Sequence, residues 1–303
     1  MNADYRVLGI DLGGTNLRFG VVDPRGGLSH WHHEPVDWAL SADGLVDWIV
    51  RRVETAGCLP GVSAVAIGIA GTVLNGQVLK PGMINLPALG DYPLSERMAA
   101  RLALPCWMGN DADLALRGEV QFGAARGYKN VLLITLGTGI GGGLLLDGRL
   151  RYGPQGSVGE IGPMLLPIPS LAVPVSIESL AAPGSIMKQL RDQKGRLFER
   201  LRQGDPLAAR LAEEMFQAVG MTIANIHMLL GLELVLIFGG IASEGEELLD
   251  GFRREFTRLC PPIYHYGLRI GFGSLPADTA GVIGAACHWF ERQGLLPSLH
   301  YGE

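Results

Sequence analysis

The chain has 303 residues, 48% of them hydrophobic, and a formal net charge of −5. This is enough apolar material for roughly two domains with large cores, and the slight negative charge argues against a nucleic-acid-binding or membrane-binding surface. No run of about 18 uninterrupted apolar residues is present to span a bilayer, and the first residues lack the apolar core of a signal peptide. We therefore expect a cytoplasmic protein whose partners are small molecules.

A short glycine turn joins two β-type runs near the N-terminus, with the sequence Asp-Leu-Gly-Gly-Thr-Asn. Its paired glycines, Gly13 and Gly14, would let the backbone turn with positive φ and bring N–H groups close to an anion. Thr15 and Asn16 add side-chain donors, and Asp11 is placed to hold Mg²⁺ through water beside phosphates. An ordinary glycine hairpin would explain so short a motif equally well.

The next part of the chain predicts a layered α/β structure. The predicted elements are an edge strand at 27–36, a helix at 41–56, a buried strand at 62–69, a helix at 94–104, a strand from 105 and a helix at 113–125. Ser41 or Asp43 would cap the first of these helices. The edge strand carries three histidines, but alternation places His30 and His32 on one face and His33 on the other, which argues against a metal site.

A second strand, glycine turn and strand follow, with the predicted strand 131–136 leading into the turn at 137–143. The repeat indicates an internal duplication in which each half presents one turn to phosphates. Gly137, Gly139 and Gly142 also match the dinucleotide pattern G-x-G-x-x-G, but that pattern requires a helix to begin at the turn. Here a strand and an Asp-Gly hairpin follow, so an NAD-dependent enzyme is kept only as an alternative.

The last third of the chain predicts mainly helices. They run from 178 to 230, and a buried strand at 233–238 then ends in Gly239 and Gly240. A short strand at 269–272 precedes a final helix at about 281–292, whose small residues permit close contact with another helix.

The candidates for chemistry lie in loops after apolar segments. Asp111 stands at a strand end before a helix, where the positive helix end would favour an ionised acid that accepts a proton during phosphoryl transfer. Alternatively, Asp111 or Asp113 serves only as the helix cap. Sugars are bound by carboxylates and amides, and the candidates for this role are Asn85, Asn110, Glu160 and Glu178.

Seven motifs together resemble those of the bacterial ROK family of sugar kinases, glucokinase-like members in particular, in that family's order over nearly the whole chain. They are Asp11-Leu-Gly-Gly-Thr-Asn16, Gly68-Ile-Ala-Gly71, Asn110-Asp-Ala-Asp113, Leu136-Gly-Thr-Gly-Ile-Gly-Gly142, Gly159-Glu-Ile-Gly162, Phe238-Gly-Gly240 and Gly281-x-x-Gly-Ala-Ala286.

The resemblance implies an actin-like ATPase fold, in which two ribonuclease-H-like α/β domains are related by duplication and flank a central cleft. It implies a small domain at 1–112, joined by the C-terminal helix at about 286–303, and a large domain at 113–285. It also implies a homodimer and the cofactors ATP and Mg²⁺.

The resemblance also assigns roles to particular residues. Asp111 becomes the general base, and Asn85, Asn110, Glu160 and Glu178 become sugar ligands. The phosphates of ATP would lie against Gly13, Gly14, Thr15, Thr138 and Gly139, and the adenosine near Gly239 and Gly240.

The chain departs from the family at one loop. Family members carry a histidine after Gly-Glu-x-Gly and then a cluster of cysteines that binds structural zinc. This chain has Pro163 at the histidine position and no cysteine between Glu160 and Glu178, so we expect no structural zinc. Proline cannot donate a hydrogen bond, which leaves the identity of the sugar open.

These observations predict an ATP-dependent hexose kinase acting on the 6-hydroxyl of glucose or a close relative. A β-glucoside, fructose or N-acetylmannosamine stays open as the acceptor. A sugar-sensing regulator without catalysis is the alternative from another class. Such regulators carry an N-terminal DNA-binding domain, whereas the phosphate strand here begins within about ten residues of Met1.

Overall fold

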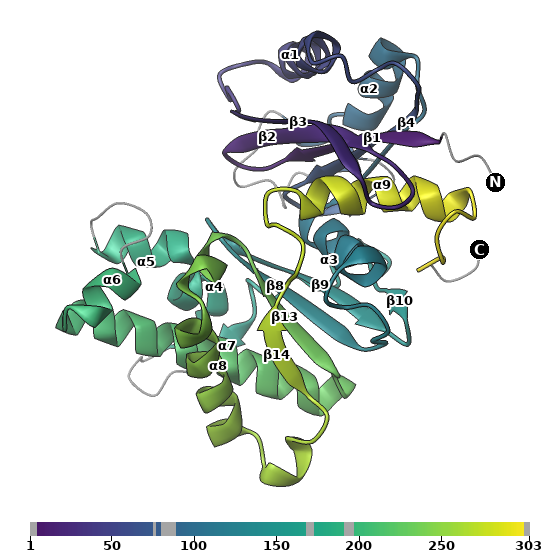
Figure 1. The fold of residues 1–303 in the computed structure, drawn as a ribbon. Coiled ribbons are helices and arrows are strands. Elements are labelled where there is room, and N and C mark those ends of the chain that lie inside the picture. Colours follow the sequence, from purple (N-terminus) through teal and green to yellow (C-terminus); the bar gives the residue numbers. More distant parts are fainter. Residues whose placement is uncertain (1–4, 75–76, 80–88, 168–172, 191–196, 300–303) are drawn as a thin grey trace. The chain divides into compact units, whose positions relative to one another are not determined.

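The computed structural model describes residues 5–74, 77–79, 89–167, 173–190 and 197–299 (Figure 1). They form two compact units. The first unit comprises Met1–Gly127, Arg149–Val158 and Ser274–Glu303, and the second comprises Tyr128–Gly148 and Gly159–Gly273.

The first unit is built on a five-stranded sheet in the order β3-β2-β1-β4-β7. The strands are β1 (Arg6–Leu12), β2 (Asn16–Val22), β3 (Leu28–Pro35), β4 (Val62–Ile69) and β7 (Cys106–Asn110). The first three form an antiparallel meander, and β4 and β7 continue the sheet parallel to β1. The carboxyl ends of β1, β4 and β7 therefore lie at one edge.

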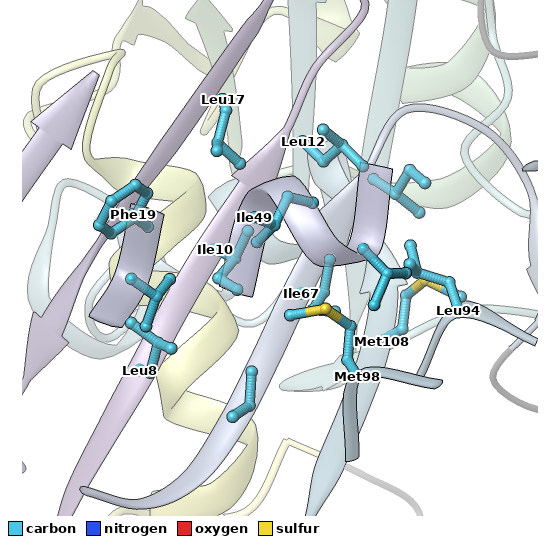
Figure 2. Close-up of a cluster of buried hydrophobic side chains, with 14 of the residues drawn as sticks. Leu8, Ile10, Leu12, Leu17, Phe19, Ile49, Ile67, Leu94, Met98 and Met108 are labelled. Carbon is cyan, nitrogen blue, oxygen red and sulfur yellow. The ribbon is translucent and has the colours of Figure 1, made fainter. Parts of the chain in front are cut away.

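Helices cover both faces of this sheet, as Figure 1 shows. Leu8, Ile10 and Leu12 alternate along β1 and pack with α1 (Ala42–Thr55) and α2 (Leu94–Leu102) in one core (Figure 2). Val7, which precedes Leu8, belongs to the core on the opposite face, formed with α3 (Asp111–Phe122) and α9 (Ala280–Arg292). Because successive side chains of a strand point to opposite faces, β1 contributes residues to both cores. Ser41 caps α1 as predicted, accepting a hydrogen bond from Gly44 N at 3.1 Å.

Helices α3 and α9 approach closely through glycine, as the small residues of α9 predicted. A Cβ at Gly284 would overlap the backbone carbonyl of Leu114, and a Cβ at Gly118 would lie 3.1 Å from the carbonyl oxygen of Ala280. Both helices belong to the first compact unit, whereas the family resemblance assigns residues 113–285 to the large domain. The expected domain division therefore stays a prediction.

Buried charges of α3 hold the later segments of the first unit. The fully buried Arg117 donates to Glu291 at 3.0 Å and to the Tyr152 hydroxyl at 2.6 Å. Two residues on, the buried carboxylate of Glu119 accepts hydrogen bonds from the backbone N–H of Ser274 (3.1 Å) and Leu275 (2.8 Å). Partners of this kind are required because a buried charge without them is strongly destabilising.

The second unit repeats the same strand arrangement, in the order β9-β8-β13-β14. Its strands are β8 (Val131–Leu136), β9 (Ile140–Leu146), β13 (Leu234–Phe238) and β14 (Arg269–Phe272). As in the first unit, a hairpin of two antiparallel strands is extended by two strands parallel to the first. The predicted internal duplication is confirmed. After β9, Asp147 and Gly148 have φ values of 56° and 75°, as an Asp-Gly hairpin requires, and β10 (Arg149–Leu150) returns to the first unit.

Helices make up most of the rest of the second unit. They are α4 (Ile177–Ala181), α5 (Pro183–Leu190), α6 (Leu197–Arg202), α7 (Pro206–Leu230), α8 (Glu246–Leu259) and the 3₁₀ turns η3 (Gly240–Glu244) and η4 (Pro262–Tyr264). Helix α8 was not predicted from the sequence. Its buried residues Leu248, Phe252 and Phe256 recur every fourth position, which is the signal that could have found it.

Two short hairpins complete the fold. The first, β5 (Val73–Leu74) with β6 (Gln77–Val78), belongs to the first unit. The second, β11 (Leu165–Leu166) with β12 (Val175–Ser176), lies in the second unit, where the family carries its zinc-binding cysteines. The described residues of this stretch therefore include a small antiparallel hairpin after Pro163.

Candidate functional site

Predicted site residues of the first unit gather at the carboxyl edge of its sheet. Asp11 on β1 is aligned with Gly68 on β4, and Gly68 is aligned with Gly109 on β7. Two strand spacings separate Asp11 from Gly109, a Cα distance of about 10 Å. Asn110 and Asp111 follow immediately. The edge therefore brings the predicted metal-binding acid at the end of β1 and the predicted base just after β7 to the same side of the sheet, with the end of β4 between them.

The glycine turn at this edge is closed by a hydrogen bond from Gly13 N to Asn16 O at 3.0 Å. The indole of Trp38 donates to Gly14 O at 2.9 Å, and Val36 N donates to Thr15 O at 3.0 Å. These bonds occupy carbonyl oxygens of the turn, and Gly14 and Thr15 are exposed. The positive φ expected at Gly13 and Gly14 is wrong, because neither glycine is in that region. The missing Cβ, rather than an unusual φ, leaves room for an anion.

Asp11 is paired with a residue that the sequence analysis overlooked. Arg18 stands directly opposite it in the β1–β2 register and donates to its carboxylate at 3.0 Å. Burial raises the pKa of Asp11, while the charge of Arg18 acts to lower it. A Cβ at Gly281, in the first turn of α9, would lie 3.2 Å from Asp11 Cγ, so the positive end of that helix adjoins the acid. Hairpin pairing, which is readable from the sequence, could have found Arg18.

The acid predicted as the base is not the helix cap. Asn110 caps α3, because its side-chain oxygen accepts from Ala112 N (2.8 Å) and Asp113 N (3.1 Å). Its amide donates to Gly71 O at 3.1 Å. Asp111 occupies the first helical position and accepts from Ala112 N at 2.9 Å. The alternative in which Asp111 or Asp113 supplies the cap is therefore wrong, and Asn110 has structural bonds besides its predicted contact with the sugar.

The second unit places the other glycine turn and Gly239 at the end of neighbouring parallel strands. Thr138 is exposed, and Gly137 N donates to Gly139 O at 3.0 Å to close the turn. Gly239 has a φ of 110°, and a Cβ there would overlap the carbonyl of Leu136 just before the turn. Gly240 follows and is exposed, so the predicted phosphate and adenosine residues of this unit adjoin one another.

Two predicted sugar ligands, Glu160 and Glu178, lie near this second turn. Glu178, in the first turn of α4, accepts a hydrogen bond from Ile140 N at 2.9 Å. Burial, and then the charge of Glu178, raises the pKa of Glu160. The two acids are therefore close enough to interact, as residues that share one polar ligand must be. Asn85, the remaining predicted sugar ligand, lies outside the described residues.

Magnesium fits one position among the predicted residues. Mg²⁺ in phosphate sites is bound by one or two carboxylates together with phosphate oxygens and water. Asp11 offers a carboxylate beside the first turn, and its present partner Arg18 is a counter-charge of the kind that such an acid needs. The three histidines of β3 do not form a site. His30 has a φ of 52° and His32 stacks on Phe19, and within the described ranges no group of three or more His, Cys, Asp or Glu side chains could hold a metal ion.

Comparison with known proteins decides the family. The model of the ROK family matches residues 7–292. The chain belongs to the ROK family. The glucokinase of Streptomyces coelicolor is 29% identical over 278 residues, which cover 83% of this chain and 87% of that enzyme. The bifunctional enzyme NanE/NanK of Brucella melitensis is 31% identical over 255 residues, covering 81% of this chain and 46% of the relative.

Solved structures agree with this assignment. A ROK family glucokinase from Streptomyces griseus in complex with glucose and AMPPNP has a TM-score of 0.79 and 28% identity, with 93% of this chain and 98% of that chain covered. The predicted family and the predicted actin-like ATPase fold are confirmed. Among the described residues of this ROK protein, no helix is long and apolar enough to cross a membrane.

Proposed function

We propose that this ROK protein is an ATP-dependent hexose kinase that transfers the γ-phosphoryl group to a sugar hydroxyl. The proposal rests on the start of α3. Asn110 caps this helix, so the carboxylate of Asp111 is not required for the cap and can serve as the base. The glucokinase relatives support the same activity.

The proposed reaction needs little covalent chemistry from the protein. The sugar hydroxyl oxygen attacks the γ-phosphorus, the bond from that phosphorus to the β–γ bridging oxygen breaks, and ADP leaves. Asp111 accepts the hydroxyl proton. The N–H groups of the two glycine turns and the hydroxyls of Thr15 and Thr138 hold the phosphates, and Gly239 and Gly240 lie against the adenosine. Asp11 would hold Mg²⁺ through water, and the ion would neutralise charge on the phosphates.

The sugar would be held by Asn85, Asn110, Glu160 and Glu178. We propose glucose or a close relative as the substrate, phosphorylated at the 6-hydroxyl. N-acetylmannosamine is a second candidate, because the N-acetylmannosamine kinase of Salmonella paratyphi A is 27% identical over 288 residues. Pro163 removes a donor where the family has histidine, and structural zinc is not part of the proposal.

The deciding experiment is a coupled assay of ADP release on metal-chelated protein to which Mg-ATP is restored. The acceptors are glucose, mannose, fructose, N-acetylmannosamine and a β-glucoside. We expect turnover with one hexose and none before Mg²⁺ is restored. Binding of a sugar without turnover with any acceptor would contradict the proposal and favour a sensor.

We further propose a homodimer in the cytoplasm, where ATP is supplied. Exposed apolar side chains of the second unit near the end of α7 and η4 offer a surface for the second copy, and large exposed patches of this kind mark interfaces. They are Met228, Leu229, Ile263, Tyr264 and Tyr266. Leu229→Glu should shift the mass measured by light scattering from that of a dimer to that of a monomer. An unchanged mass would rule out this surface.

A further inference from the structure

Glu178 contacts two segments of the second unit that the proposed kinase reaction uses: the glycine turn that would hold phosphates and the segment that carries Glu160. Its carboxylate oxygen Oε2 accepts the hydrogen bond of Ile140 N at 2.9 Å, and a Cβ at Gly139 would come within 2.6 Å of the same oxygen. The carboxylate thus fills the space beside the phosphate turn, Gly137–Ile140, that the missing side chain of Gly139 leaves.

The same residue is bound to the segment that carries Glu160. Glu178 N donates to Gly162 O at 3.1 Å, and a Cβ at Gly162 would lie 3.2 Å from Glu178 Oε2. Burial raises the pKa of Glu160, and the charge of Glu178 acts in the same direction. One side chain therefore lies between the phosphate turn and the loop of the proposed sugar ligands.

We infer that Glu178 is a positioning residue that couples occupancy of the sugar site to the phosphate turn. The inference rests on the proposed kinase function. A carboxylate bound to the turn fixes Ile140 N–H, and its negative charge opposes the phosphates of ATP. A sugar hydroxyl that donates to this carboxylate disperses the charge and immobilises the side chain, so sugar and nucleotide each strengthen the binding of the other. Thermodynamic linkage requires the effect to be reciprocal.

Two substitutions separate the contact with the turn from the contact with the sugar. Glu178→Gln keeps an oxygen that can accept from Ile140 N but removes the charge. Glu178→Asp keeps the charge but is shorter by one methylene group and withdraws the acceptor from the turn. Gly139→Ala attacks the same contact from the other side and leaves residue 178 intact.

The measurement is calorimetric titration of the full chain with AMPPNP and Mg²⁺, without sugar and with saturating glucose. We expect glucose to tighten AMPPNP binding in the wild type. Without sugar, the affinity should fall about fivefold in Glu178→Asp and in Gly139→Ala, which is the loss of roughly one hydrogen bond, and stay within about threefold in Glu178→Gln. The tightening by glucose should shrink toward onefold in all three variants.

Glu214→Gln is the matched control, because Glu214 pairs with Arg210 along α7 and lies outside the proposed sugar and nucleotide sites. Its AMPPNP affinity without sugar should equal that of the wild type. Wild-type affinity in both Glu178→Asp and Gly139→Ala, with each variant folded by circular dichroism, would overturn the inference. A wild type that binds neither AMPPNP nor glucose would overturn the proposed function itself, so the two failures are distinguishable.

Discussion

The two glycine turns share a backbone arrangement but receive their charges differently. In the first unit the acid, Asp11, stands on the strand before the turn and is balanced by Arg18 across the hairpin. In the second unit the corresponding pair across the hairpin, one position before the last pair, is Thr135 and Gly141, and the carboxylate comes from Glu178 on α4. The comparison teaches that the repeated hairpin supplies backbone groups, whereas the chemistry of each turn is set by side chains added to it.

The ends of the last parallel strands differ in the same way. β7 leads directly into Asn110 and Asp111, whereas β14 ends at Phe272 and is followed by Gly273 and Ser274. Only the first of these two strand ends carries an acid. The duplicated fold therefore has one strand end of this kind that could carry the proposed general base.

The largest expected effect is on catalysis. Asp111→Asn should lower kcat by about two to four orders of magnitude, because the amide cannot accept the hydroxyl proton. The substitution keeps an oxygen that can accept from Ala112 N, so the melting temperature should change little. The measurement is steady-state ADP release with calorimetric AMPPNP binding as the control for an intact nucleotide site. A kcat within tenfold of the wild type would remove Asp111 from the role of base.

A buried ion pair joins α3 and α9 in the first unit, whereas an exposed pair joins α7 and α8 in the second. Arg117→Met leaves Glu291 buried without its main counter-charge, and burial already raises the pKa of that acid. The free energy of unfolding should fall by about 3–5 kcal/mol.

The matched control in the second unit is Glu213→Gln, which removes the pair of Glu213 with Arg254 between α7 and α8 and leaves Arg254 bound to Glu255. The side chains of Glu213 and Arg254 are both about half exposed, so the loss should stay below about 1 kcal/mol. Urea denaturation measures both variants. Equal losses would show that burial does not set the strength of the pair.

Helix glycines offer a third comparison. Gly284→Ala forces a Cβ into the backbone carbonyl of Leu114, and the free energy of unfolding should fall by about 1–3 kcal/mol, despite the higher helix propensity of alanine. In the second unit, Gly251→Ala meets the ring of Phe216, a side chain that can move. We expect a smaller loss there, measured by thermal unfolding. A larger loss at Gly251 would contradict this ranking of the two helix contacts.

The smallest effect concerns the pH dependence of stability. The pKa of Glu160 is raised in the folded protein, so its contribution to stability is present below the ordinary pKa and is lost as pH rises through the raised value. Glu160→Gln avoids that loss and should be more stable by a few tenths of a kcal/mol at neutral pH, since solvent screens this partly exposed acid.

The gain in stability of Glu160→Gln should vanish in acid. The same variant should also bind the sugar more weakly than the wild type. Denaturant titrations at several pH values measure the first effect. A gain that is constant with pH would exclude the ionisation of Glu160 as its cause.

The sequence determined the family, the duplicated α/β fold and most of the elements, because these depend on local patterns. Apolar runs predicted the strands β1 and β4, and Ser41, one of two predicted caps, marked the start of α1. The glycine of the Asp147-Gly148 turn predicted a hairpin. Residues such as Gly284 were rightly expected to allow helices to touch, because a missing side chain has the same consequence wherever the partner lies.

Which groups meet depends on packing in three dimensions. The role of cap fell to Asn110 rather than to Asp111, the glycines of the first turn proved to have ordinary φ, and Glu178 reached the phosphate turn from 38 residues away. The pairing of Arg117 with Glu291 spans 174 residues. Such contacts depend on how helices and strands pack in three dimensions, and no periodicity in one chain encodes the distance between two segments that are remote in the sequence.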